Sequence, residues 1–293
     1  MPDILRLGSH DIEITNRDKL FFPGEGITKG ELIDYYQRIA DVMIPYIKGR
    51  PVTMHRFPDG IEGEGFFQQQ IGDYFPDWIN RIALAKEDGE TTHLICDDAA
   101  TLVYIANQGC ITPHVWLSRR DKIDYPDMLV FDLDPPGNDF AAVRRAALYL
   151  RQVLDELGLK AYVKTTGSRG LHIVTPLDRS ADFDGVRAFA REVAKILAEK
   201  HPQEVTKEQR KLKRGDRVFI DIGRNSYGQT AVAPYAVRAK PGAPVATPLE
   251  WDELEDSGIN SQSYNIKNIW RRLSQKKDPW QGMWRQAHSL KNR

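Results

Sequence analysis

Residues 128–136 read MLVFDLDPP, and this short run decides the fold. It has the apolar composition of a buried strand, yet Asp132 and Asp134 interrupt it before the prolines end it. A second run of the same kind, RVFIDIGRN at 217–225, carries Asp221. Because a carboxylate in an apolar strand is costly unless a partner compensates it, the three aspartates indicate a functional site.

The segments after residue 136 alternate between helical and extended patterns. Apolar residues at helical spacing predict helices over 139–157 and 183–200. Strands are expected at about 127–134, 160–165, 171–177 and 217–223. The order β-α-β-β-α-β is that of the split unit of ferredoxin-like folds, in which the first strand lies between the third and the fourth. The sequence therefore predicts an α/β (α+β) fold with a ferredoxin-like sheet in its catalytic core.

The alternation of side chains along a strand places the aspartates on one face of this sheet. Asp132 and Asp134 point to the same side of the first strand. Asp221 and His172 occupy the matching positions of the last and the third strand. Since the helices must cover the apolar face, we expect these four side chains together on the open face, on adjacent strands.

Three neighbouring carboxylates are suited to hold divalent cations. Mg²⁺ and Mn²⁺ prefer oxygen ligands, and a pair of such ions serves phosphoryl and nucleotidyl transfer. Asp132, Asp134 and Asp221 are therefore the candidate metal ligands and catalytic residues. The same carboxylates would also serve a metal-dependent nuclease or phosphatase, and Asp-x-Asp occurs in glycosyltransferases and at exposed strand ends.

Polar residues near these strands are candidates to bind phosphate. The glycine-rich turn TTGSRG at 165–170 offers backbone N–H groups, although a plain hairpin turn is the alternative. His172 follows the turn and could contact a triphosphate, while a lone histidine on a strand is more often structural. Arg238, in APYAVRAK, could clamp phosphate, or be an ordinary surface arginine. The candidates within the turn are Thr166, Ser168 and Arg169.

Composition limits the remaining possibilities. The chain has 293 residues, 41% hydrophobic and 28% charged, with zero formal net charge, which is ordinary for a soluble protein and argues against one that coats nucleic acid. No apolar run approaches the roughly 18 residues of a membrane span, and the N-terminus lacks a signal-peptide pattern. Cys96 and Cys110 cannot alone build a disulfide framework or a zinc site. We therefore expect a cytoplasmic protein.

Basic residues gather in two places. Residues 207–217 read KEQRKLKRGDR, and 267–293 hold eight Lys or Arg against one acid, with Trp270, Trp280 and Trp284 between them. Local basic patches in a neutral chain suit a protein that binds phosphates at chosen places, and solvated surfaces are the alternative.

Four spaced motifs resemble the polymerase domain of bacterial ATP-dependent DNA ligase D, an end-joining enzyme of the archaeo-eukaryotic primase superfamily. They lie in the family's order between about residues 10 and 240. The motifs are ITNRDKLFFPGEGITKGELIDYY, FDLDPP, TTGSRGLHIVTPL and VFIDIGRNSYGQTAVAPYAVR. The resemblance implies a primase-like core with a packed N-terminal α/β part, and two-metal catalysis with Mn²⁺ or Mg²⁺.

The resemblance also implies roles for individual residues, and Asp132, Asp134 and Asp221 match the family's metal ligands. The residues that match the nucleotide site are His172, Arg238, His114, Thr166 and Arg169, with Ser168 in the same turn. Lys19 and Lys29 match a pair that holds a downstream 5′-phosphate, and Phe66 and Phe67 match aromatics that pack on the template.

Two positions depart from the family pattern. Arg169 stands where some relatives carry lysine, which keeps the charge and changes the geometry. His55 stands where some relatives carry a permanently basic residue, so Arg56 is the alternative nucleotide-binding residue there.

These observations predict one primase-polymerase domain over 1–293, with an N-terminal DNA-end part (about 1–115), a catalytic core (116–240) and a basic helical segment (241–293). The expected function is a polymerase that fills DNA ends and gaps in bacterial non-homologous end joining, with a preference for ribonucleotides. The expected partners are 5′-phosphorylated DNA, NTP or dNTP, a ligase and Ku-type proteins in the bacterial nucleoid, with no membrane. A primase that starts chains without a primer and a non-catalytic DNA-end bridging module are the alternatives.

Overall fold

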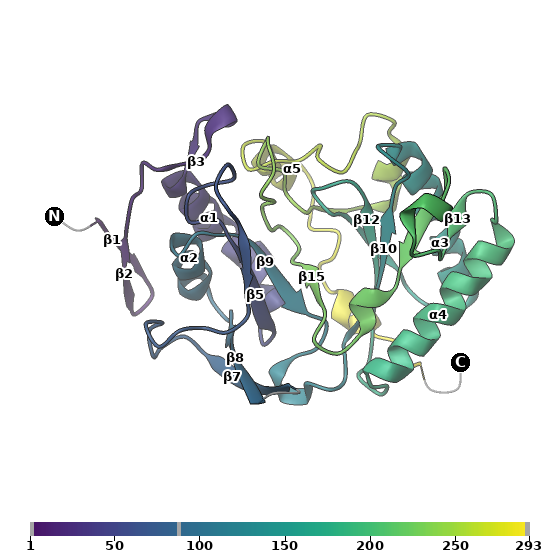
Figure 1. Cartoon of the computed structure of the whole chain (residues 1–293), viewed down its shortest axis with the longest axis horizontal. Coiled ribbons are helices and arrows are strands. Elements are labelled where there is room, and N and C mark those ends of the chain that lie inside the picture. The colour runs from purple at the N-terminus through teal and green to yellow at the C-terminus, as the bar shows by residue number, and fades with distance from the viewer. Residues whose placement is uncertain (1–2, 87–88, 291–293) are drawn as a thin grey trace. The chain divides into compact units, whose positions relative to one another are not determined.

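The computed structural model describes residues 3–86 and 89–290 (Figure 1). The chain divides into two compact units, each with a sheet of its own. Unit 1 takes the chain as far as Trp116, together with Thr230–Val245 and Asn265–Ile269, and unit 2 takes the remainder. Among the described residues, no helix combines the length and apolar character that crossing a lipid bilayer requires.

Unit 2 contains a six-stranded sheet with the order β13-β14-β10-β12-β11-β16. The first strand, β10, lies between β12 and β14, which is the position that the sequence predicts for it. All its pairings are antiparallel except that of β13 with β14. The strands are β10 (Met128–Asp134), β11 (Tyr162–Thr165), β12 (Leu171–Pro176), β13 (Val205–Thr206), β14 (Val218–Asp221) and β16 (Pro248–Leu249).

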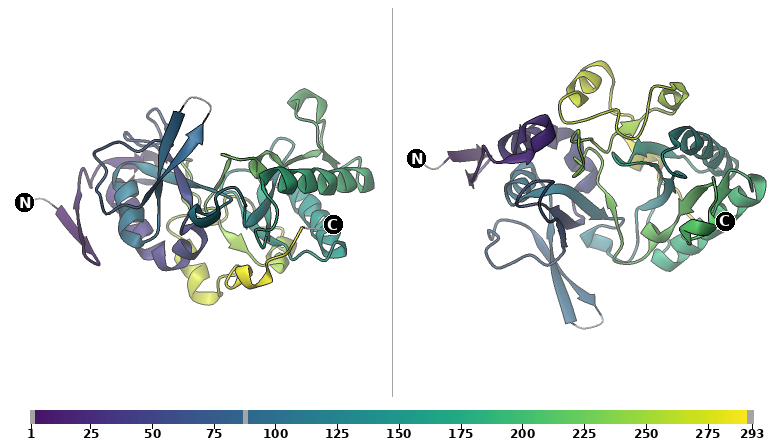
Figure 2. Two further views of the ribbon diagram at one scale, coloured as in Figure 1. Left: turned by 90° about the horizontal axis from the view of Figure 1, so that it is seen from below. Right: turned by 45° about the horizontal axis from the view of Figure 1, so that its top comes forward.

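Two helices, α3 (Phe140–Glu156) and α4 (Phe183–Lys200), cover one side of this sheet (Figure 2). Each begins at an aspartate whose side chain accepts a hydrogen bond from the first turn, Asp139 from the Ala142 N–H and Asp182 from the Gly185 N–H. Their apolar faces pack on one core. Its central side chains are Leu129, Phe131, Leu133, Val143, Leu150, Ile173, Val186, Leu197 and Ile220.

That core uses every second residue of β10. Leu129, Phe131 and Leu133 lie in it, so Asp132 and Asp134 point to the opposite face, as the alternation predicts. The helices therefore leave the aspartate face of the sheet open, and the fold assigns that face to the candidate site.

Unit 1 is built on a second sheet with the order β15-β9-β5-β8-β7, to which β6 adds by pairing with β5. Its long helix, α1 (Lys29–Ile47), begins with the predicted capping box, since Thr28 and Glu31 exchange side-chain to backbone hydrogen bonds. The helix α2 (Ala99–Asn107) packs against α1. The hairpin of β7 and β8 projects from the rest of this unit (Figure 2). The strands are β1 (Asp3–Leu7), β2 (His10–Ile14), β3 (Leu20–Phe22), β4 (Ile27–Thr28), β5 (Pro51–Arg56), β6 (Phe66–Gln68), β7 (Arg81–Lys86), β8 (Gly89–Ile95), β9 (Cys110–Trp116) and β15 (Thr230–Val232).

The segment 241–293, expected to be helical, is mostly not so in its described part. That part contains β16, the helix α5 (Ile269–Gln275) and two 3-10 helices at Trp251–Glu255 and Met283–Gln286. Trp280 in its basic run is buried, and its indole N–H donates to the Val163 carbonyl at 3.0 Å. This tryptophan therefore packs under β11. Residues 291–293 at the end of the run lie outside the described residues.

Candidate active site

Four polar side chains form one row across the open face of the unit 2 sheet. Asp132 on β10 lies opposite Asp221 on β14 and opposite His172 on β12. His172 in turn lies opposite Lys164 on β11. Directly opposed side chains of antiparallel strands have Cβ atoms about 4.5–5.5 Å apart, so the row is continuous. The sheet register thus brings together Asp132, Asp221 and His172, as the sequence predicts.

Asp132 is buried and in contact with two basic side chains. Its Oδ1 lies 3.5 Å from the His172 Nε2, and its Oδ2 lies 3.5 Å from the Arg224 Nε and Nη2. Burial by itself raises the pKa of Asp132, but His172, Arg224 and Lys164 outweigh burial and lower that pKa to about 2. The carboxylate is therefore ionised at neutral pH.

His172 is neutral at the same pH. Burial, helped by the neighbouring charges of Lys164 and Arg224, lowers its pKa to about 4 in spite of Asp132. The other ring nitrogen, Nδ1, is buried and has no hydrogen-bond partner among the described residues. A buried ring nitrogen of this kind is available to a bound ligand.

The other two aspartates are more exposed than Asp132. Burial raises the pKa of Asp134, and the negative charges of Asp132 and Asp221 add to that effect against Arg169 and Arg214. Asp221 is oriented by its own turn, because its Oδ1 accepts a hydrogen bond from the Gly223 N–H at 2.7 Å. The carboxylates of Asp132 and Asp221 therefore act on that of Asp134 across β10 and β14.

These residues fit a divalent cation by their chemistry, since they supply oxygen donors from adjacent strand positions with mutual repulsion for a cation to relieve. Their side chains are not arranged as a preformed cage. Within 3–86 and 89–290, no three His, Cys, Asp or Glu side chains form a group that could hold a metal ion. The Asp221 side chain instead accepts the Gly223 N–H, and Asp132 contacts Arg224.

The turn after β11 folds around Thr166. The Thr166 Oγ1 accepts hydrogen bonds from the N–H groups of Ser168 and Gly170, at 3.3 and 3.2 Å. The predicted phosphate cradle therefore has two of its N–H groups engaged within the turn. Ser261 closes the turn from outside, because its hydroxyl donates to the Gly170 carbonyl at 2.9 Å.

Gly170 brings this turn against the end of β10. A Cβ at that position would lie 1.9 Å from the Leu133 carbonyl oxygen, so only glycine fits. Exposed Arg169 and half-buried Ser168 line a cavity of about 320 Å³ beside the turn. The Gln262 side chain closes that cavity by donating to the Ser168 carbonyl at 2.7 Å. The contact with Leu133 places the turn next to Asp134, the following residue of β10.

Sequence reasoning missed three residues of this site. Lys164 is buried, with 2% of its surface exposed, and lies on the same face as His172. The alternation of side chains along β11 is the one sequence signal for this placement. Arg224, which contacts Asp132, lies in the quoted run RVFIDIGRN but was not singled out. Asn225 is fully buried and its side chain bonds both backbone groups of Val130, at 2.8 and 2.7 Å. Asn225 thereby continues the pairing of β10 beyond the last residue of β14.

The predicted 5′-phosphate pair lies together in unit 1. The Lys29 N–H donates to the Lys19 carbonyl at 2.8 Å, and Lys29 is the first residue of α1. Its buried ammonium donates to the carbonyl and hydroxyl of Thr15, at 2.6 and 2.9 Å. Burial, with repulsion from Lys19, lowers the pKa of Lys29 to about 8. Lys19 forms an ion pair with Asp59. The two lysines thus lie together at the N-terminus of α1, where backbone N–H groups and the helix dipole favour anions.

Aromatic rings share one face of β5, β6 and β9 in the same unit. The His55 ring stacks on Phe67 at 4.1 Å between centroids, and the His114 ring meets Phe67 edge-on at 5.5 Å. Phe67 is 61% exposed. Arg238 also acts on this group of rings. Burial is the larger cause that lowers the pKa of His55, and the positive charge of Arg238 adds to it.

Arg56 does not join that group. Its neighbour His55 is paired with Phe67, whereas Arg56 is paired with Phe66 on the opposite face. The Arg56 Nε donates to the Gln108 carbonyl at 2.7 Å, and its guanidinium lies over the Phe66 ring, 5.5 Å from the centroid. Phe66 and Phe67, both exposed, therefore present their rings to different sides.

Comparisons with known proteins identify the family that this chain resembles. The family described as "LigD, primase-polymerase domain" matches residues 28–280. The multifunctional non-homologous end joining protein LigD of Mycobacterium bovis is 36% identical over 263 residues, which are 87% of this chain and 35% of that protein. The bifunctional non-homologous end joining protein LigD of Bacillus subtilis is 30% identical over 271 residues, 92% of this chain and 43% of that protein.

A solved structure is also similar to this chain. The polymerase domain from Mycobacterium tuberculosis ligase D in complex with DNA superposes with a TM-score of 0.88 at 33% identity, covering 94% of this chain and 99% of that one. The chain spans about a third of the length of the Mycobacterium bovis relative, 35%.

Proposed function

Because the chain belongs to the LigD primase-polymerase family, we propose that it is a metal-dependent nucleotidyltransferase that extends a 3′-hydroxyl at DNA ends and short gaps. The observation that carries the proposal is the register of Asp221, Asp132 and His172 across three adjacent strands. It puts carboxylates and an imidazole on the one sheet face that the helices leave uncovered. Such a surface suits a substrate that carries several phosphates.

In this proposal Asp132, Asp134 and Asp221 hold Mn²⁺ or Mg²⁺. Divalent cations bound there would lower the pKa of a 3′-hydroxyl and balance the charge that develops on the triphosphate. The 3′-oxygen forms a bond to the α-phosphorus, the bond to pyrophosphate breaks, and the hydroxyl proton leaves to solvent. Arg224 holds Asp132 from one side, 3.5 Å away, which keeps the carboxylate ionised and oriented.

The turn after β11 and His172 are proposed to receive the nucleotide's phosphates. Their support is the unpartnered Nδ1 of His172 and the cavity that Ser168 and Arg169 line. Thr166 shapes the turn through its hydroxyl rather than by facing outward. The nucleotide roles of His114, Arg56 and Arg238 stay predictions from the family resemblance, and the placement of Arg56 on the opposite face from His55 and Phe67 lends it no support.

The finer biology is proposed on the same basis. Lys19 and Lys29 would bind a downstream 5′-phosphate at the start of α1, which their adjacency supports. Exposed Phe67, which shares its face with His55 and His114, would stack on template bases, worth about 1–3 kcal/mol per base, whereas the role of Phe66 on the opposite face stays a prediction from the family resemblance. A preference for ribonucleotides, action in bacterial end joining with a ligase and Ku-type proteins, and a place in the cytoplasmic nucleoid complete the proposal.

Primer extension on a gapped DNA with a 5′-phosphate tests the function. The assay compares ribonucleotides with deoxyribonucleotides, Mn²⁺ with Mg²⁺, and the unaltered chain with Asp132→Ala. Extension that depends on both the metal and Asp132 is the expected result. Cleavage of labelled DNA without nucleotides would indicate a nuclease, dinucleotides from free triphosphates would indicate a primase, and DNA binding without any synthesis would indicate a bridging module.

A further inference from the structure

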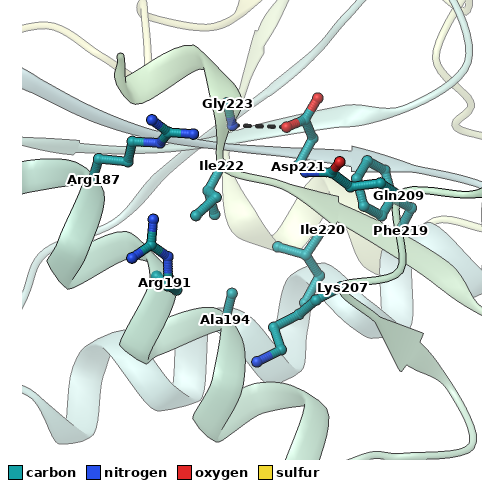
Figure 3. A pocket seen from close by; sticks show the side chains of 10 residues that line it. All are labelled: Arg187, Arg191, Ala194, Lys207, Gln209, Phe219, Ile220, Asp221, Ile222 and Gly223. Atoms are coloured by element: carbon teal, nitrogen blue, oxygen red, sulfur yellow. Dashed lines mark hydrogen bonds between the residues drawn. The ribbon is translucent and has the colours of Figure 1, made fainter.

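A second cavity, lined in part by cationic side chains, lies on the far side of β14 from β10, with a volume of about 250 Å³ (Figure 3). Its walls are one face of α4, the chain that leaves β13, and the end of β14 with the turn after it. The residues that line it are Arg187, Arg191, Ala194, Lys207, Gln209, and 219–223.

The cavity exists because β13 is short. It pairs with β14 only at Val205 and Thr206, opposite Val218 and Phe219. The chain then leaves the sheet at Lys207, so Ile220 and Asp221 have no strand partner on that side. The strand that carries Asp221 thus has one edge on β10 and its other edge on this cavity.

Three cations line the cavity and are not engaged elsewhere. Arg187 and Arg191, one helical turn apart on α4, extend toward the turn at Gly223 (Figure 3). Within the described parts of the chain, neither arginine nor Lys207 forms a hydrogen bond or an ion pair. The one carboxylate in the lining, Asp221, accepts the Gly223 N–H. Three cations against this carboxylate leave the lining with a net positive charge, and such a recess concentrates anions.

The position of the cavity relative to the active-site row indicates which part of the substrate would reach it. His172 and the phosphate-binding turn lie on the β12 side of Asp132, whereas Asp221 and the cationic cavity lie on the β14 side. If the triphosphate binds at His172, the opposite end of the row, at Asp221, is available to the strand whose 3′-oxygen attacks. On the proposed polymerase function, the next backbone phosphates of that strand would lie beyond Asp221, around the edge of β14, where Arg187 and Arg191 of α4 line the cavity and could bind phosphate oxygens with paired N–H groups.

We infer that the cavity of Arg187, Arg191 and Lys207 is a binding site for backbone phosphates of the primer strand near its 3′-end. The inference rests on the proposed polymerase function and adds to it the path of one strand. It predicts that these residues set the affinity for primer and leave the affinity for nucleotide unchanged.

The test compares Arg187→Ala/Arg191→Ala with a control that loses the same charge, Lys160→Ala/Lys195→Ala. Lys160 and Lys195 are exposed, lie in the same unit and do not line the cavity. Fluorescence anisotropy measures binding of a primed template over a series of salt concentrations. Steady-state extension measures KM for primer and for nucleotide separately, and thermal melting checks that both variants fold.

The arginine variant is expected to raise the primer KM about tenfold and leave the nucleotide KM unchanged. It should also reduce the slope of log K against log salt by about one to two, because roughly one counterion is released per phosphate contact. Arg187→Lys/Arg191→Lys should recover the slope, since it keeps the charge.

Equal behaviour of the arginine variant and its control would overturn the inference. A raised nucleotide KM with unchanged primer affinity would also overturn it, by assigning the phosphate to the nucleotide. If the unaltered chain binds primed DNA and does not extend it, the polymerase function fails, and the anisotropy data still decide whether the cavity binds the strand.

Discussion

Asp132 and Asp221 stand directly opposite each other on the antiparallel strands β10 and β14. Like charges in this position repel and destabilise a sheet. Arg224, whose guanidinium lies 3.5 Å from Asp132, offsets part of that repulsion within the protein. In the proposed enzyme a divalent cation would offset the rest, which would couple catalysis and sheet stability at one pair of residues.

Replacing Asp221 with asparagine should separate the two effects. The amide keeps an oxygen to accept the Gly223 N–H and removes the charge that opposes Asp132. Without metal, the free energy of unfolding is expected to rise by about 0.5 kcal/mol, while nucleotide addition is lost. Denaturant titration and primer extension measure the two outcomes.

Adding Mn²⁺ sharpens that experiment. Binding to the folded state stabilises the unaltered chain, and Asp221→Asn should lose most of this stabilisation. Asp216→Asn, an exposed position in the preceding loop, is the matched control and should respond to Mn²⁺ like the unaltered chain. A variant at 221 that keeps both activity and the metal response would remove Asp221 from the proposed site.

Gly170→Ala should destabilise unit 2 and damage the turn after β11. The added Cβ would lie 1.9 Å from the Leu133 carbonyl oxygen, so the turn or the end of β10 must move. We expect a loss of about 2–3 kcal/mol in the free energy of unfolding and weaker nucleotide binding. Gly24→Ala, which meets nothing within 4 Å, is the control in thermal and nucleotide titrations. An alanine at 170 without effect would show that the close approach is relaxed in solution.

Asn225→Ala should cost about 2–3 kcal/mol, because it leaves the N–H and carbonyl of Val130 buried without partners. It should also reduce extension in the surviving folded protein, since Asn225 ties the segment after Asp221 to β10. Urea unfolding and extension rates below the transition provide the measurements. Gln281→Ala, at an exposed position of the same unit, gives the control substitution, and equal stability of the two variants would contradict the role.

Recognition of a 5′-phosphate should weaken as pH rises through about 8. The folded-state pKa of Lys29 is lowered to about 8, so its ammonium is mostly charged at pH 7 and mostly neutral at pH 9. The phosphate stays a dianion over this range, because its second pKa is about 6. Binding of phosphorylated and unphosphorylated gaps at both pH values measures the preference.

Lys29→Ala should abolish that preference at pH 7, and Lys86→Ala, an exposed lysine on β7, should retain it. Equal loss on phosphorylated and unphosphorylated DNA would mean that Lys29 serves the fold, through its bonds to Thr15. If Lys29 binds the phosphate, Lys29→Arg, which is charged at every pH, should restore the preference without restoring its pH dependence.

Periodicity was sufficient to predict the central strands, their order and the face that carries Asp132, Asp134 and Asp221. These features follow from local alternation and from the need to cover one apolar face. The capping box at Thr28 is equally local, and the structure contains it. The nearness of Lys19 to Lys29 came from the family resemblance rather than from the pattern.

Contacts between distant segments could not be predicted in this way. A lysine on a strand, such as Lys164, is ordinarily solvated, and its burial depends on what covers β11. Gly170 has the sequence context of an ordinary turn glycine. Glycine is required there because the backbone of Leu133, far along the chain, leaves no room for a Cβ. The orientation of Asp221 toward its own turn is likewise a side-chain choice that no spacing reveals.

The aspartates also disfavour incorrect registers of β10 in the sheet. A shift of β10 by one residue would turn Asp132 into the apolar layer beneath α3 and α4 and expose Phe131 and Leu133 instead. Desolvating a carboxylate there would cost far more than a misplaced leucine. The aspartates proposed for catalysis therefore also disfavour shifted registers of β10. A neutral substitution such as Asp132→Leu would remove both the proposed activity and this penalty on misalignment.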